Sequence, residues 1–300
     1  RRYEIAASAS SGGCSRSLNL TLNLLRSAPA FFIPAKKWLG WFLVALPLFL
    51  CQSCSYLAAL RHTYTADAVP EQNFHFQDGG QAIYFTFDKR LDSWPPTAAS
   101  PAVETYLFVI SGSGCTSMKY LLPQYFRGLE GESGPIRIFI LQKRFIEART
   151  WGRVLGCSED FIKADHPQRW IADQAEFINA QLASAQNRAT SPKRVVVLGV
   201  SEGGDIVPVL ARHIDGVTHA AILANGGMNP LDAYRLQASK HGFNIAPNAL
   251  QNMRPDAAAH RIAGRTWRYW FELGQLKHTE GLLTLTMPLL VAMGEADQAV

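Results

Sequence analysis

The chain has 300 residues, of which 48% are apolar and 18% charged, and this composition is typical of a globular protein. It excludes the disordered, collagen-like and coiled-coil classes. The formal net charge of +5 comes from the N-terminal segment: residues 1–62 carry seven basic side chains and one acidic, whereas residues 63–300 carry 22 basic and 23 acidic ones. Because the main part is nearly neutral, we expect no nucleic acid partner.

An apolar run near the N-terminus predicts a targeting segment. Lys36 and Lys37 precede a 13-residue apolar run, and the uncharged stretch extends over residues 38–60. Basic residues before an apolar run of this length are typical of a secretory signal peptide. The same stretch is long enough to act as a membrane anchor. We therefore expect residues 1–62 to be a presequence and residues 63–300 to be secreted or periplasmic, with membrane association through residues 38–60 as the alternative.

The two ends of the sequence are unusual. The chain begins at Arg1, its first methionine is Met118, and its last residue, Val300, closely follows a strand-like apolar segment. We expect a fragment or a misplaced gene boundary, with the folded domain incomplete at its C-terminus.

The cysteines allow one disulfide in the folded part. Cys14, Cys51 and Cys54 lie in the expected presequence, which leaves Cys115 and Cys157. In an oxidising compartment these two could pair. Two buried thiols that act as small apolar residues fit the sequence equally well.

Apolar and β-branched segments alternate with helix-length segments along the chain. Six segments are strand-like: residues 82–87, 105–110, 136–141, 194–200, 219–224 and 288–293. Apolar residues at three- and four-residue steps predict a helix over residues 167–185. Strands that are apolar throughout and alternate with helices indicate an α/β fold, with a mostly parallel sheet and helices on both faces.

The alternation stops between residues 229 and 285, and we interpret this interval as an inserted helical cap. It is rich in aromatic residues, which either pack in the core beneath the cap or line an apolar substrate pocket. It also carries three more basic than acidic side chains. This excess favours either an acidic substrate group or an ordinary solvated helix face.

The most informative motif is Gly199-Val200-Ser201-Glu202-Gly203, directly after a predicted buried strand. A serine raised on a sharp turn between a strand and a helix needs small neighbours, because the helix passes close to the strand. Gly199 and Gly203 supply this space, so we interpret Ser201 as a nucleophile. The acidic side chain of Glu202 is explained by its place at a helix N-terminus. Pro208 predicts a kink or a late start in the following helix.

With this motif the chain resembles the α/β-hydrolase family over roughly residues 80–300. The resemblance implies an oxyanion loop after the strand 105–110, where Ser111-Gly112-Ser113-Gly114-Cys115 follows. Backbone N–H groups near Ser113 and at Glu202 would then hold the negative oxygen of a tetrahedral intermediate. It also implies a catalytic acid after a late strand, and Asp297 occupies that position, with Asp232 as the alternative.

The histidine of the implied triad is not evident. In the family it follows the acid by tens of residues, and only three residues follow Asp297. Each of the eight histidines fits a structural role better, although a rearranged cap could bring His278 to the site. We therefore expect the base to lie beyond Val300 and the 300-residue chain itself to be nearly inactive.

These observations predict a serine hydrolase of carboxylic esters or related acyl compounds, with a small-molecule acyl substrate. The alternative is a non-catalytic binding or scaffold protein that has the same fold. The sequence contains no metal-ligand spacing, Walker loop or dinucleotide fingerprint, so we expect no cofactor and no metal.

Overall fold

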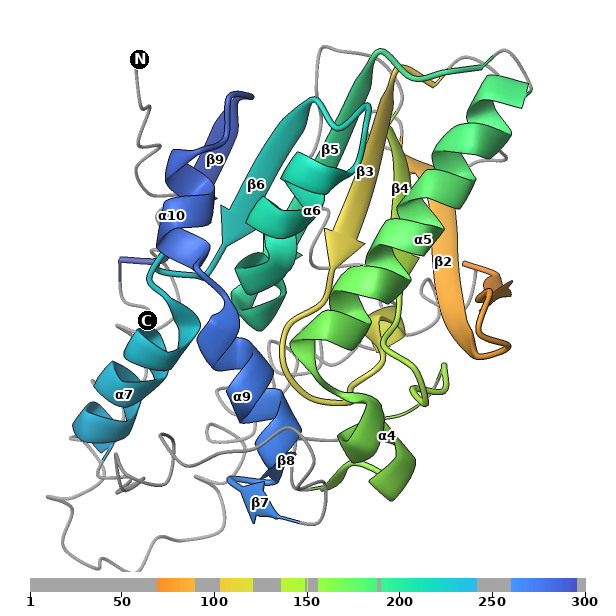
Figure 1. The fold of residues 1–300 in the computed structure, drawn as a ribbon. Helices are drawn as coiled ribbons and strands as arrows, with labels where there is room; N and C mark the ends of the chain where they lie inside the picture. Colours follow the sequence, from red (N-terminus) through yellow and green to blue (C-terminus); the bar gives the residue numbers. More distant parts are fainter. Residues whose placement is uncertain are drawn as a thin grey trace, which may run out of the picture. The chain divides into compact units, whose positions relative to one another are not determined.

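A seven-stranded sheet forms the centre of the described structure (Figure 1). Its strands are β1 (Glu71–His75), β2 (Gln81–Lys89), β3 (Thr105–Ile110), β4 (Ile136–Leu141), β5 (Arg194–Val200), β6 (His219–Leu223) and β9 (Leu289–Ala292). They follow the order β1-β2-β4-β3-β5-β6-β9. The pairs β1–β2 and β2–β4 are antiparallel, and all other pairs are parallel. The predicted mostly parallel sheet is confirmed, and β1 is a strand that the sequence pattern did not indicate.

The computed structural model describes residues 69–89, 103–120, 136–148, 150, 156–187, 190–241 and 260–295. The expected presequence, residues 1–62, and Asp297 lie outside these ranges. Among the described residues, no helix has the length and hydropathy needed to cross a membrane.

Six α-helices accompany the sheet in these ranges. They are α4 (Glu159–Ala164), α5 (Pro167–Asn187), α6 (Val207–His213), α7 (Pro230–His241), α9 (Trp267–Gln275) and α10 (His278–Leu283). Two 3-10 turns, η2 (Met118–Tyr120) and η4 (Ser201–Ile206), and a small hairpin of β7 (Arg261–Ile262) and β8 (Arg265–Thr266) complete the described elements. The predicted helix over residues 167–185 is α5. Helix α6 starts late, as Pro208 predicts, with the proline in its first turn.

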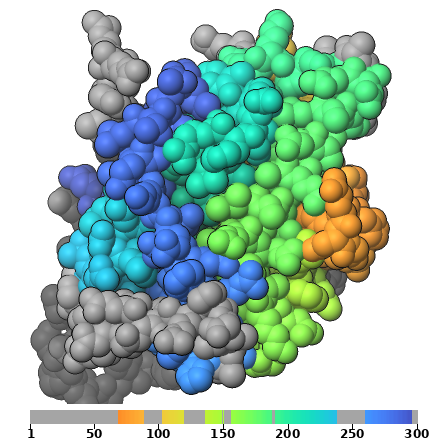
Figure 2. All heavy atoms as spheres, viewed as in Figure 1, coloured from red at the N-terminus to blue at the C-terminus, as the bar shows by residue number. Residues whose placement is uncertain are grey.

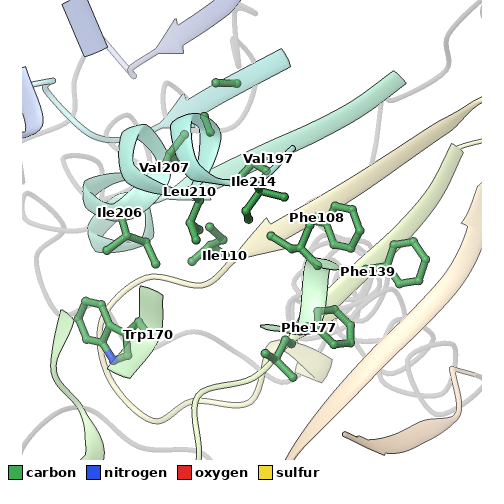
Figure 3. Packing of buried hydrophobic residues seen from close by; sticks show 14 of the residues in the cluster. Phe108, Ile110, Phe139, Trp170, Phe177, Val197, Ile206, Val207, Leu210 and Ile214 are labelled. Carbon is green, nitrogen blue, oxygen red and sulfur yellow. The ribbon is translucent and has the colours of Figure 1, made fainter. Parts of the chain in front are cut away.

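The largest core cluster lies between the sheet and helices α5 and α6 (Figure 3). Phe108 of β3 stacks on Phe139 of β4 with ring centroids 4.9 Å apart, and Phe177 of α5 meets both rings edge-on. Leu210 of α6 is also buried in this cluster. Burial of each such side chain contributes about 1.5–3 kcal/mol to the stability of the fold. The packing between the sheet and these helices therefore fixes the positions of β3, β4 and β5.

Figure 2 shows α5, α6 and α10 as neighbouring surfaces on this face of the molecule, and α6 contacts both of the other helices. A second apolar cluster lies on the opposite face of the sheet and includes Phe85, Leu107, Ile140 and Met118. In β3, Leu107 and Val109 belong to the second cluster, whereas Tyr106, Phe108 and Ile110 belong to the first. Alternate residues of a strand point to opposite faces, so both faces of the sheet are apolar, as the sequence predicts for a central parallel strand.

The interval 229–285 is helical over much of its described length. In Figure 1, α7 and α9 lie toward the carboxyl ends of the parallel strands, whereas α10 lies beside β9. Its last helix, α10, packs against α6 rather than standing apart from the sheet. The aromatic residues have both expected uses: Tyr269 and Trp270 are buried in the main core, and they also line a cavity together with Tyr234.

Candidate active site

Ser201 lies on a sharp turn at the carboxyl end of β5. Its φ is +53°, a left-handed conformation that costs a non-glycine residue about 1–3 kcal/mol and is concentrated at functional sites. The strand ends at Val200 and the 3-10 turn η4 begins at Ser201 itself. The residue is exposed, whereas Gly203 to Ile206 behind it are buried. The turn therefore presents the serine hydroxyl at the surface of a rigid element.

The two flanking glycines leave room for this turn. A Cβ atom on Gly199 would lie 2.5 Å from the carbonyl oxygen of Gly203. A Cβ atom on Gly203 would lie 2.5 Å from the carbonyl oxygens of both Ile110 and Ser111. Real Cβ atoms do not approach backbone oxygens this closely, so only glycine fits at either position. The spacing has the geometry expected of a nucleophile elbow.

The loop after β3 comes close to Ser201. A Cβ atom on Gly112 would lie 3.2 Å from the Cβ atom of Ser201, and Ser113 lines the same cavity as Ser201. The structure therefore brings together the two segments that the sequence assigns to the nucleophile and the oxyanion loop.

A disulfide joins this loop to the segment before α4. Cys115 and Cys157 are bonded, with their Cα atoms 5.7 Å apart, so the alternative of two free thiols is wrong for this structure. The bond packs against Ile146, Phe161 and Ile162 in a small core of its own. The two cysteines are 42 residues apart. Because the bond restricts the unfolded chain, a loop of this length stabilises the folded state by about 4 kcal/mol. The oxyanion-loop candidate is thereby anchored one residue after Gly114.

Ser201 opens onto a cavity of about 270 Å³. Its wall combines polar residues from the elbow and from the loop after β6 with aromatic and apolar residues from α7 and α9. The lining includes Ser113, Glu202, Asp205, Asn225, Tyr234, Arg265 and Trp270. The cavity lies at the carboxyl ends of parallel strands, where open α/β sheets bind their ligands.

The side chain of Glu202 belongs to a buried ionic network, and its helix position alone does not explain it. Arg265 Nη2 donates to Glu202 Oε2 at 2.8 Å, and Lys143 Nζ lies 3.6 Å from Glu202 Oε1. Lys143 and Arg265 both also pair with Asp165. Burial alone would raise the pKa of Glu202, but Arg265 and Lys143 hold it below its usual value. Arg265 and Lys143 are distant in sequence, so the pattern around Glu202 gave no signal of them.

Asp205 and Asn225 form a second polar group beside the serine. Asn225 Nδ2 donates to the carbonyl oxygen of Ser201 at 3.0 Å and to Asp205 Oδ1 at 2.8 Å. Gly227 N–H donates to Asn225 Oδ1 at 3.0 Å. Burial raises the pKa of Asp205 to about 7. Asp205 was not predicted as a site residue, although a carboxylate in front of the apolar run Ile206-Val207 is a signal that could have identified it.

None of the described histidines lines the cavity. His278 is buried in α10, its Nδ1 lies 3.2 Å from the carbonyl oxygen of Asp205, and burial lowers its pKa. His166 Nδ1 lies 2.7 Å from Glu272 Oε2 in the interior. His213 is exposed at the end of α6. These positions fit the structural roles that the sequence suggests for them.

The alternative acid, Asp232, is not placed at the site. It lies in the first turn of α7, about half exposed, where it accepts a hydrogen bond from Arg235 at 2.9 Å. It is not among the described residues that line the cavity. The preferred acid, Asp297, lies outside the described ranges, and its assignment stays a prediction.

The described arginines of the interval 229–285 are each bound to a carboxylate. The pairs join Arg235 to Asp232, Arg261 to Glu159, Arg265 to Asp165 and Glu202, and Arg268 to Glu272. The positive excess counted in the sequence therefore gives these arginines no free charge for an acidic substrate. No cluster of three or more potential metal ligands occurs among the described residues.

Comparison with known proteins finds likeness in structure alone: no protein-family profile and no curated protein matches the chain. A soluble variant of the monoglyceride lipase of Saccharomyces cerevisiae, solved with a substrate analogue, is 14% identical over 77% of this chain and 78% of that chain, with a TM-score of 0.45. An esterase of Pyrococcus furiosus is 12% identical over 77% and 72%, with a TM-score of 0.43. Acetyl xylan esterase 1 of Thermoanaerobacterium is 14% identical over 77% and 69%, with a TM-score of 0.42.

The assignment of the fold rests on this chain's own topology. The parallel strands β4, β3, β5, β6 and β9 lie side by side, with an antiparallel β2 next to β4. The sharp turn at Ser201 follows β5, and the glycine-rich loop at Gly112 follows β3. This arrangement matches the positions that the family resemblance implies for the elbow and the oxyanion loop. The chain has the α/β-hydrolase fold.

Proposed function

We propose that the protein is a serine hydrolase that cleaves carboxylic esters or related acyl compounds. The observation that carries this proposal is the left-handed conformation of Ser201 at the end of β5, directly at a cavity. A strained, exposed serine on a buried scaffold is the geometry that nucleophilic catalysis by an elbow serine requires.

In the proposed reaction Ser201 Oγ attacks the acyl carbon and loses its proton to a histidine base. The bond from the acyl carbon to the leaving alcohol then breaks, the alcohol takes the proton, and water later releases the acid from the serine. Backbone N–H groups of Ser113 and Glu202 hold the oxyanion, and each such donor contributes about 3 kcal/mol to transition-state stabilisation. Asp297 orients the histidine, which must come from outside the described residues.

Labelling with a fluorophosphonate probe tests the proposal in the full-length protein, because the probe reacts with activated serines. We expect covalent labelling of Ser201, and none in Ser201→Ala. The matched control is Ser191→Ala, which removes an exposed serine before β5 and should be labelled like the unmodified protein. Labelling that persists in Ser201→Ala contradicts the assignment. Absence of labelling and of ester turnover in the full-length protein favours the alternative, a binding protein with the same fold.

We further propose that the domain works outside the reducing cytoplasm, as a secreted or periplasmic protein. The bond between Cys115 and Cys157 supports this location, because structural disulfides persist in oxidising compartments. Fractionation of cells that express the protein with and without residues 1–62 distinguishes a cleaved signal from a retained anchor. A folded, disulfide-bonded protein found only in the cytoplasm would contradict the proposal.

A further inference from the structure

Asp205 differs from the other buried carboxylates of the described residues in its partners. Five such carboxylates are buried: Asp88, Asp165, Asp173, Asp205 and Glu272. The other four pair with arginine, lysine or histidine side chains. Asp205 forms no ion pair with any described residue and accepts instead from the neutral amide of Asn225. A buried carboxylate normally has a cationic partner, because an unpaired buried charge is costly.

Lys143, whose charge acts on Asp205, and Arg265, which lines the same cavity, already have carboxylate partners. Lys143 and Arg265 bind Asp165 and Glu202. When Asp205 is ionised, the cluster therefore contains two cationic side chains and three carboxylates. The cluster has one negative charge too many, and the excess lies on the residue that lines the cavity with Ser201.

Part of the cavity wall is uncharged and aromatic. Tyr234 and Trp270 both line the cavity, with ring centroids 4.4 Å apart. Tyr269 also lines it, but its ring already has the guanidinium of Arg265 at 4.3 Å. Faces of tryptophan and tyrosine rings attract cations and are used to bind quaternary ammonium groups. The rings of Tyr234 and Trp270 therefore favour a positively charged ligand. The unpaired carboxylate of Asp205 favours the same kind of ligand.

We propose that the cavity selects substrates that carry an ammonium group, with the cation facing Asp205 and the acyl carbon at Ser201. This inference rests on the proposed hydrolase function for its reaction, but the cation site itself does not depend on catalysis. The burial that raises the pKa of Asp205 to about 7 is consistent with a carboxylate whose counter-ion comes from a ligand.

A pair of isosteric esters tests the proposal with the full-length protein. Acetylthiocholine carries a trimethylammonium group, and 3,3-dimethylbutyl thioacetate has a neutral carbon in place of the nitrogen. We expect kcat/KM to be at least tenfold higher for the cationic ester. Equal values, or a preference for the neutral ester, would overturn the proposal without any variant.

Asp205→Asn assigns the preference to this side chain, because the substitution keeps the shape and removes the charge. It should lower the ratio of kcat/KM for acetylthiocholine to kcat/KM for the neutral ester at least tenfold. The matched control is Asp232→Asn, which removes a half-exposed carboxylate outside the cavity lining and should leave the ratio unchanged. An equal loss for both esters in Asp205→Asn would contradict a role in selectivity.

Choline binding separates this inference from the hydrolase proposal. Calorimetric titration of the unmodified protein and of Asp205→Asn with choline chloride requires no catalysis. We expect the Kd for choline to rise at least tenfold in the variant. Choline binding that depends on Asp205 in a protein without labelling at Ser201 would support the cation site and contradict the hydrolase. No choline binding by the unmodified protein, or the same Kd in both proteins, would contradict the cation site.

Discussion

Asn225 holds the backbone of Ser201 through a hydrogen bond of 3.0 Å from its Nδ2 to the serine carbonyl oxygen. The same amide nitrogen donates to Asp205, and its oxygen accepts from Gly227 N–H. The side chain therefore links the end of β6 to the strained turn after β5, so the position of the nucleophile depends on two neighbouring strands.

Substitution of Asn225 should disturb catalysis more than substrate binding. We expect Asn225→Ala to lower kcat for an ester substrate about tenfold, corresponding to about 1.4 kcal/mol, with KM within twofold, because the serine loses a hydrogen bond that fixes its backbone. Steady-state kinetics measure both constants. Asn73→Ala, an exposed asparagine on β1, is the control. A change in KM alone would assign Asn225 to substrate binding instead.

The close backbone contact at Gly203 leads to a prediction about stability. Gly203→Ala places a methyl group 2.5 Å from the carbonyl oxygens of Ile110 and Ser111, so the elbow or β3 must move. We expect a loss of about 3 kcal/mol in the free energy of unfolding, measured by urea denaturation. Gly156→Ala is the control, since no atom lies within 4 Å of its added Cβ. A loss below about 1 kcal/mol at Gly203 would show that the elbow is not tightly packed.

Much of the sheet and the elbow could be predicted because their signals are local. Apolar β-branched runs mark β3, β4 and β5, and the glycines around Ser201 report a close backbone contact. Strand β1 was missed because its residues alternate between exposed and half-buried, which weakens the apolar signal.

The polar residues around the serine could not be predicted in the same way. Arg265 meets Glu202 across 63 positions of sequence, and Asn225 meets Asp205 across 20. Such partners are set by the folding of the chain and leave no pattern in either segment. The pairing of Cys115 with Cys157 was open for the same reason, since spacing alone does not fix the distance between two side chains.

Removal of Arg265 should be far more damaging than removal of a surface arginine. Arg265→Met leaves Asp165 and Glu202 buried with Lys143 as their shared partner, and loss of one member of a buried ionic network costs about 3–5 kcal/mol. Arg261→Met is the control, because Arg261 pairs with the exposed Glu159 and surface pairs of this kind contribute little to stability. Chemical denaturation of both variants measures the difference, and equal losses would contradict the stabilising role of the network.

The raised pKa of Asp205 makes stability depend on pH in a defined direction. Its pKa rises from 3.8 to about 7 on folding, so between these values the folded state binds the proton more tightly than the unfolded state. The stabilisation is fully present below the unfolded pKa and is lost as pH rises through the folded pKa. Glu202, Lys143, Tyr269 and the ring of His278 are the other ionisable groups that face this residue.

Asp205→Asn removes this titration, and the comparison with the unmodified protein isolates it from other groups. We expect the variant to gain stability relative to the unmodified protein as pH rises from 4 to 8, by on the order of 4 kcal/mol in total. Urea denaturation at several pH values measures the difference, with Asp232→Asn as the exposed control. If the difference between Asp205→Asn and the unmodified protein stays constant over this range, the carboxyl is not held protonated by burial. A gain that is confined to ligand-free protein and disappears at saturating choline would also show that the bound cation stabilises the ionised form.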